Sequence, residues 1–174
     1  MKKRHWERFF LCILLLMALF FWAGLRTELT VRRYPVESGL VTQPKQLVFL
    51  SDLHSCVYGE GQRKLLELVE AQGPDLVLLG GDWVDDDFGR RSPERAYCAA
   101  RALAAQYPTF YVLGNHEQWS GHADEIKEAL TACGVTVLAG EWADLDLDGA
   151  PIRLFGMDDP DVGEKLWQEQ LAHL

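Results

Sequence analysis

The chain has 174 residues, with 17 basic and 26 acidic side chains and a formal net charge of −9. This length suits one domain with a short extra segment and excludes two full domains. The charge is uneven, because residues 1–33 sum to +5 and residues 34–174 to −14. So acidic a body argues against a nucleic-acid-binding domain, which normally shows a basic surface. The four cysteines are scattered and form no C-x-x-C pair, which argues against a zinc ribbon or a disulfide scaffold.

The amino-terminal region combines a basic tail at residues 1–8 with an uncharged apolar stretch at residues 9–25. As a helix, this stretch would be about 25 Å long, close to the ~30 Å hydrocarbon core of a bilayer. Its basic flanks, and the tryptophans Trp6 and Trp22 near its ends, favour an uncleaved single-pass transmembrane anchor over a cleaved signal peptide or a buried core helix. The charge bias predicts a cytoplasmic amino terminus and an acidic body outside the cytoplasm.

Residues 26–45 are expected to link this anchor to a domain at residues 46–174, in which apolar runs of strand length alternate with helical patterns. The expected strands are Leu47–Ser51, Asp75–Leu79, Thr109–Leu113 and Val135–Leu138. The expected helices are Gln62–Gln72, Pro93–Gln106, Ala123–Cys133 and Gly163–Leu174. A hairpin is expected around the turn Asp148-Gly149, with Ile152–Phe155 as its second arm. The strand–helix alternation predicts an α/β fold with a largely parallel sheet.

Polar residues follow each of the first three expected strands, at its carboxyl end. They are Asp52 and His54, then Asp82, then Asn115 and His116. Parallel strands one β-α-β unit apart bring equivalent ends to one edge of the sheet, so these side chains should converge there. Oxygen and nitrogen donors without thiolate suit Mn, Fe, Zn or Mg. For each residue alone, a helix cap, a turn or a surface position is the alternative.

The three motifs occur in the order D-x-H, G-D-x-x-D and G-N-H-[DE], and between about Leu47 and Asp161 the chain resembles the calcineurin-like metallophosphoesterases. The expected anchor and the segment Gly156–Pro160 look like the bacterial phosphodiesterase branch of that family. The resemblance implies a two-sheet αββα sandwich. It also implies hydrolysis of a phosphate mono- or diester by a dinuclear centre of divalent metal ions with a bridging hydroxide.

The resemblance also implies a role for each matched residue. Asp52 and His54 would hold the first metal, Asp82 would bridge the two metals, and Asn115 would hold the second. His116 would contact the phosphoryl oxygens or protonate the leaving group instead of binding metal. Two acidic residues, Asp85 and Glu117, would orient these groups. The residues after Asp85, Asp86 and Asp87, are expected to form a solvated loop.

The family pattern continues with further metal-binding histidines, including a G-H-x-H pair, that the present sequence lacks. Apart from His54 and His116, the histidines are His5, His122 and His173, and none stands in a matching motif. The chain is therefore expected to hold the amino-terminal half of the sandwich, preceded by one transmembrane helix, with an incomplete second metal site and reduced or absent activity. The alternatives are a non-catalytic, membrane-tethered metal-binding remnant and an unrelated α/β binding module. The expected substrate is a phosphate ester, with a lipid-linked or envelope phosphate suggested by the anchor.

Overall fold

The computed structural model describes residues 2–24, 28–39, 41, 43–147 and 149–174. The chain divides into two compact units, Met1–Val36 and Glu37–Leu174. The first unit contains helix α1, Lys2–Gly24. Among the described residues, no helix is both long and apolar enough to cross a bilayer, so the transmembrane span expected at residues 9–25 is not supported. The last residue of that expected span, Leu25, lies outside the described residues.

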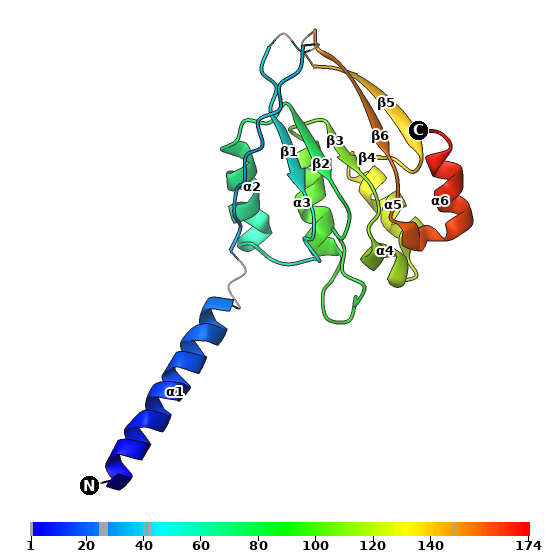
Figure 1. Ribbon diagram of the computed structural model, residues 1–174. Coiled ribbons are helices and arrows are strands. Elements are labelled where there is room, and N and C mark those ends of the chain that lie inside the picture. Colours follow the sequence, from blue (N-terminus) through cyan, green and yellow to red (C-terminus); the bar gives the residue numbers. More distant parts are fainter. Residues whose placement is uncertain (1, 25–27, 40, 42, 148) are drawn as a thin grey trace. The chain divides into compact units, whose positions relative to one another are not determined.

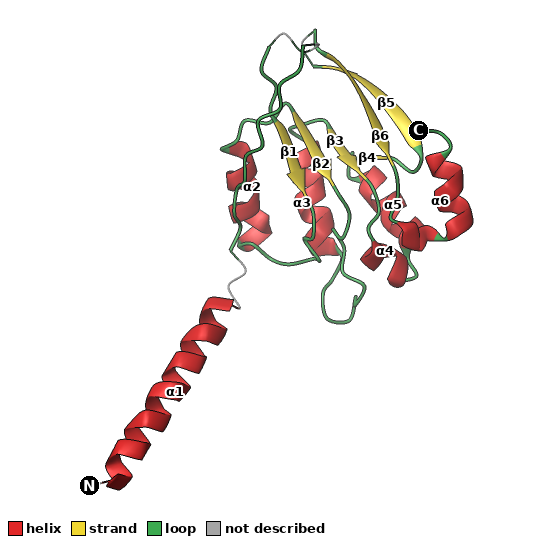
Figure 2. Ribbon diagram, in the orientation of Figure 1, coloured by secondary structure: helices red, strands yellow, loops and turns green. Residues whose placement is uncertain are grey.

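The second unit is built on a four-stranded parallel sheet with strand order β1-β2-β3-β4 (Figures 1 and 2). Its strands are β1 at Leu47–Leu50, β2 at Leu76–Leu79, β3 at Thr109–Tyr111 and β4 at Thr136–Val137. The pairing register aligns Leu47 with Leu76 and Val77 with Thr109. All four strands fall within the runs that the sequence predicted, and the parallel α/β class is confirmed.

Helices cover one face of this sheet (Figure 2). They are α2 at Arg63–Glu70, α3 at Glu94–Ala104 and α5 at Ala123–Ala132. Small residues of α3, Ala96, Ala99 and Ala100, are fully buried and let this helix approach the sheet closely. Shorter elements lie in the connections: η1 at Glu60–Gln62, α4 at Asn115–Trp119 and η2 at Pro160–Val162. The pattern of apolar residues in the sequence gave no indication of α4, which has only 5 residues.

An antiparallel hairpin packs on the other face of the sheet (Figure 1). Its strands are β5, Glu141–Asp146, and β6, Pro151–Gly156, and helix α6, Glu164–Leu171, follows. In the turn expected between the strands, Asp148 lies outside the described residues. The core between sheet and hairpin consists of Leu76, Phe110, Leu138 and Leu147, with Leu78, Val112, Ala143, Leu145, Ile152 and Leu154 packed against it. The hairpin leaves the outermost strand β1 less covered, and Phe49 there is 65% exposed.

Candidate metal centre

The candidate site lies where the first three strands of the parallel sheet end. The loop after β1 carries Asp52 and His54, the loop after β2 carries Asp82, and α4 after β3 carries His116. Because the strands are parallel neighbours, their carboxyl ends share one edge. The convergence predicted from the spacing of the three motifs therefore occurs for these four side chains.

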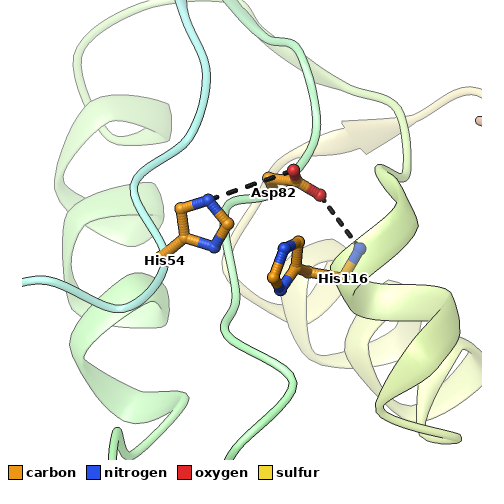
Figure 3. Close-up of side chains that lie close together, drawn as sticks. All are labelled: His54, Asp82 and His116. Carbon is orange, nitrogen blue, oxygen red and sulfur yellow. Dashed lines mark hydrogen bonds and ion pairs between the residues drawn. The ribbon is translucent and has the colours of Figure 1, made fainter.

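Figure 3 shows the centre of this arrangement, with the rings of His54 and His116 beside the Asp82 carboxylate. The two ring centroids are 4.4 Å apart, and the rings stand edge to face at 81°. His54 Nε2 lies 4.0 Å from Asp82 Oδ2 and 3.9 Å from Asp52 Oδ1. The backbone N–H of His116 donates to Asp82 Oδ1 at 3.0 Å. The Asp82 carboxylate thus contacts both the loop that carries His54 and the helix that carries His116.

The loops that carry these residues adopt an unusual backbone conformation. Asp52, His54 and Asp82 have φ values of 59°, 46° and 49°, in the left-handed region that side chains with a Cβ rarely adopt. Three backbone hydrogen bonds hold the loops together: from Asp52 N to Gly81 O at 3.2 Å, from His54 N to Asp82 O at 2.9 Å and from Ser55 N to Trp83 O at 3.1 Å. Such strain persists only where surrounding contacts fix it, and it is concentrated at functional sites in proteins.

Two glycines allow the loops after β2 and β3 to approach each other. Gly81 has a φ of 88°, and a Cβ there would lie 2.6 Å from Gly114 N. A Cβ on Gly114 would overlap the backbone nitrogen and the carboxylate of Asp82. The glycines that precede Asp82 and Asn115 are therefore required by close backbone packing under the site.

The carboxylate of Glu117 lies beneath this site and is completely buried. Its Oε1 accepts hydrogen bonds from the backbone N–H groups of Trp83 at 2.6 Å and Val84 at 2.9 Å. Its Oε2 accepts from Asp82 N and Gly114 N, both at 3.0 Å. Glu117 therefore holds together the backbone of the loop after β2, which carries Asp82, and of the turn before α4, which carries His116.

The second acidic residue of the G-D-x-x-D motif, Asp85, is bound by an arginine. Arg91 Nη1 donates to Asp85 Oδ2 at 2.9 Å and to the carbonyl oxygen of His54 at 3.0 Å. The backbone N–H of Asp85 donates to Ser55 Oγ at 3.2 Å. Asp85 thus links the loop after β2 to the loop that carries His54, as a residue that orients its neighbours would. Arg91 was not recognised in the sequence because its contacts join segments 37 and 6 residues away.

His116 is paired with Asp86, a residue for which the sequence predicted only a solvated loop. His116 Nδ1 lies 2.9 Å from Asp86 Oδ1. Burial of the ring would lower the pKa of His116, but the bond to Asp86 and the negative charges of Asp82, Asp86 and Asp85 raise it above its ordinary value. The same bond lowers the pKa of Asp86. Asp86 is exposed in a loop, as expected, but nothing in the sequence indicated its contact with His116, which spans 30 residues.

Asn115 is the first residue of α4 and stands between Gly114 and His116. The segment after β6 fixes the chain just before it. Buried Asp158 accepts from Leu113 N at 3.1 Å through Oδ1, and Asp159 N donates to Leu113 O at 3.0 Å. Oδ2 of Asp158 accepts from Lys127 Nζ at 2.8 Å. The Gly156–Pro160 segment therefore anchors the turn from which Asn115 and His116 project.

The donor set fits a divalent metal ion. Among the described residues, His54, Asp82 and His116 offer ligand atoms that all lie within 4.8 Å of one another. Imidazole nitrogen with carboxylate oxygen suits Mn, Fe or Zn. The other two described histidines of this unit are held elsewhere, His122 by Glu125 at 2.8 Å and His173 by the carbonyl oxygen of Gly140 at 2.9 Å. The candidate site is therefore confined to the edge formed by the first three strands.

Comparison with known proteins agrees with this geometry. The model of the calcineurin-like phosphoesterase family matches residues 45–171. The chain belongs to this family. The matched range contains all three motifs and the hairpin, so the resemblance seen in the motifs extends over most of the second unit.

Individual relatives are moderately similar. The phosphodiesterase YaeI of Escherichia coli is 30% identical over 125 residues, which cover 70% of this chain and 46% of that protein. An uncharacterized metallophosphoesterase of Helicobacter pylori is 28% identical over 131 residues, 72% of this chain and 35% of the relative. The uncharacterized metallophosphoesterase YkuE of Bacillus subtilis is 26% identical over 132 residues, 74% of this chain and 46% of the relative. The chain thus spans between about a third and a half of the length of these relatives.

Proposed function

We propose that this chain carries the metal-binding loops of a metal-dependent hydrolase that cleaves a phosphate mono- or diester. The observation that supports this most strongly is the convergence of His54, Asp82 and His116 on one sheet edge in a member of the phosphoesterase family. The relative YaeI of Escherichia coli is a phosphodiesterase, which favours a diester substrate. Placement of the protein outside the cytoplasm stays a prediction.

Four residues of the three motifs would hold divalent ions: Asp52, His54, Asp82 and Asn115. When bound, such ions activate water as a nucleophile and stabilise the charge that develops on the phosphoryl group. Asp82 is suited to the central position because its carboxylate lies between the His54 ring and the backbone N–H of His116. Glu117 and the Asp85–Arg91 pair keep the three loops in place.

His116 would act on the leaving group. Its Nδ1 is engaged by Asp86, which fixes the ring orientation and favours the protonated imidazolium. A protonated ring at the site can donate a proton to the leaving oxygen, a contribution of roughly 10²–10⁴-fold in rate. Asp86 thus supports the protonation state that this role requires.

Metal-dependent hydrolysis of bis(p-nitrophenyl) phosphate tests the proposal. We expect turnover by the full chain with Mn²⁺, loss of turnover with EDTA, and a loss of at least about 10²-fold in Asp82→Ala and His116→Ala. His122→Ala is the matched control, because this nearby histidine bonds Glu125 instead of the site. Turnover that survives both EDTA and Asp82→Ala would contradict the proposal.

A non-catalytic metal-binding protein is the second candidate. It is favoured by the small donor set, since among the described residues the candidate group has only three His, Cys, Asp or Glu members. Calorimetric titration with Mn²⁺ separates the two functions. Binding of one ion without turnover supports the non-catalytic protein, whereas two ions at micromolar affinity support the dinuclear hydrolase.

A further inference from the structure

An exposed tryptophan stands beside the candidate catalytic histidine. Trp119 follows His116 by three residues on α4, so the two side chains lie on the same side of this short helix. Their ring centroids are 4.9 Å apart at an interplanar angle of 50°. Trp119 is nevertheless 59% exposed. A large apolar ring is therefore open to solvent at the edge of the site.

The polar atom of this indole is already satisfied. Its Nε1 donates to Asp161 Oδ2 at 2.7 Å, a contact that joins α4 to η2. The bond limits rotation of the side chain, so the ring has already lost much of the conformational freedom that binding would otherwise remove. The exposed part of the indole is therefore its apolar ring surface, and the bond to Asp161 holds that surface in place.

The other exposed tryptophan of this unit provides a contrast. Trp142 on β5 is 44% exposed, and its Nε1 donates to the carbonyl oxygen of His173 at 2.8 Å. Its ring, however, packs against Phe155 at 4.9 Å and lies under the Arg153 guanidinium at 5.7 Å. In the described part of the chain, the ring that neighbours Trp119 is the His116 imidazole itself. Trp119 thus has exposed apolar surface next to the candidate catalytic residue His116, whereas the ring of Trp142 packs against Phe155.

We infer that Trp119 is a specificity-determining residue that packs against the organic group of the phosphate ester next to His116 and selects a flat aromatic group over a small alkyl group. The inference rests on the proposed function, because a leaving group protonated by His116 must lie beside the His116 ring and so within reach of Trp119. Aromatic rings gain from stacked or edge-to-face contact beyond the burial of their area. A held indole therefore discriminates by the size and flatness of that group.

Binding of two phosphonates to the full chain with Mn²⁺ tests this inference without any ester cleavage. We expect phenyl phosphonate to bind about fivefold more tightly than methyl phosphonate, the size of effect that one aromatic contact gives. Trp119→Ala should bring the ratio close to one, and Trp119→Phe should keep most of it. Trp142→Ala, the matched control, should leave the ratio unchanged. Asp161→Asn keeps the ring but weakens its anchor, and should lower the ratio partway.

The outcomes separate the inference from the proposed function. A wild-type protein without phenyl preference, or a preference that persists in Trp119→Ala, overturns the inference. If Trp119→Ala unfolds, a lowered ratio in folded Asp161→Asn supports the inference and an unchanged ratio overturns it. If the phenyl preference depends on Trp119 but no phosphate ester is cleaved, the inference about binding stands and the proposed hydrolase fails.

Discussion

Several residues of the site hold a backbone conformation that their side chains disfavour. Asp52, His54 and Asp82 are left-handed, although only glycine adopts this region without strain. Each such residue costs on the order of 1–3 kcal/mol. The strain is held in place by contacts between loops, including the close approach of Gly81 to Gly114. These two glycines therefore affect the site more than their lack of a side chain suggests.

Gly81→Ala should destabilise the protein and displace Asp82. Its φ of 88° disfavours alanine, and the new Cβ would lie 2.6 Å from Gly114 N. We expect a loss of more than about 3 kcal/mol in urea denaturation, the range typical of clash and strain together. Gly73→Ala is the control, because Gly73 also has a positive φ, 60°, but nothing lies within 4 Å of its Cβ position. Gly73→Ala should lower the free energy of unfolding by only about 1–2 kcal/mol. Equal losses in the two variants would contradict the importance of the close approach between Gly81 and Gly114.

Asp86→Asn should lower the pKa of His116. The bond to Asp86 and the nearby acidic charges raise this pKa, so the pair stabilises the fold below the ordinary pKa of histidine, and this contribution is lost as pH rises through the folded value. An NMR titration of the His116 ring with metal chelated measures the change. Asp87→Asn is the control, because the Asp87 carboxylate accepts from Arg90 N. An unshifted titration in Asp86→Asn would rule out the pairing.

The elements of the fold matter mainly through where they end. Each parallel strand is only 2 to 4 residues long, and the loop after each of the first three turns sharply into the site. Helix α4 begins at Asn115. The carboxylate of its third residue, Glu117, accepts a hydrogen bond from the backbone N–H of Gly114, the residue just before the helix. The same carboxylate binds the loop after β2. One buried side chain thus joins a helix start to a strand end.

Glu117→Gln should therefore weaken both fold and metal binding. An amide offers one oxygen acceptor and places its NH₂ group against backbone donors, so buried N–H groups lose their partners. We expect a loss of about 2–4 kcal/mol in urea denaturation, together with weaker Mn²⁺ binding by calorimetry. Exposed Glu125→Gln should change neither quantity. A fully stable Glu117→Gln protein would show that these bonds contribute little.

At the scale of the whole molecule, the site joins parts of the second unit that are distant in sequence. Arg91 links the loops after β1 and β2, and Asp158 ties the hairpin side to the turn before α4. Lys127 of α5 completes the Asp158 contact at 2.8 Å. Since ligands for one ion come from separate β-α units, metal binding should stabilise the second unit as a whole.

Addition of Mn²⁺ should raise the melting temperature of the full chain. At a free concentration of 100 times Kd, the expected stabilisation is about 2.7 kcal/mol, or roughly 5–10 °C for a protein of this size. Asp82→Asn should remove most of the shift because it removes the shared carboxylate charge, and Asp87→Asn should retain it. An equal shift in wild type and Asp82→Asn would mean that Mn²⁺ binds elsewhere.

The sequence by itself determined the parallel α/β class, the strand positions and the convergence of Asp52, His54, Asp82 and His116. These follow from local information, because apolar runs mark strands and parallel neighbours must end at one edge. The motif order also indicated the family, which the match over residues 45–171 shows.

Only the tertiary structure decided which side chains support those residues. The Asp86–His116 bond, the Arg91 link and the buried Glu117 carboxylate all depend on contacts between loops about 30 residues apart. No periodicity encodes such contacts, since a charged residue in a loop has the same local sequence whether it faces water or a neighbouring loop. The membrane span expected from the local pattern is not supported, and the bond of the exposed Asp86 to His116 was not predicted. Local physics thus fixed where the site lies, and long-range packing fixed how its residues are held.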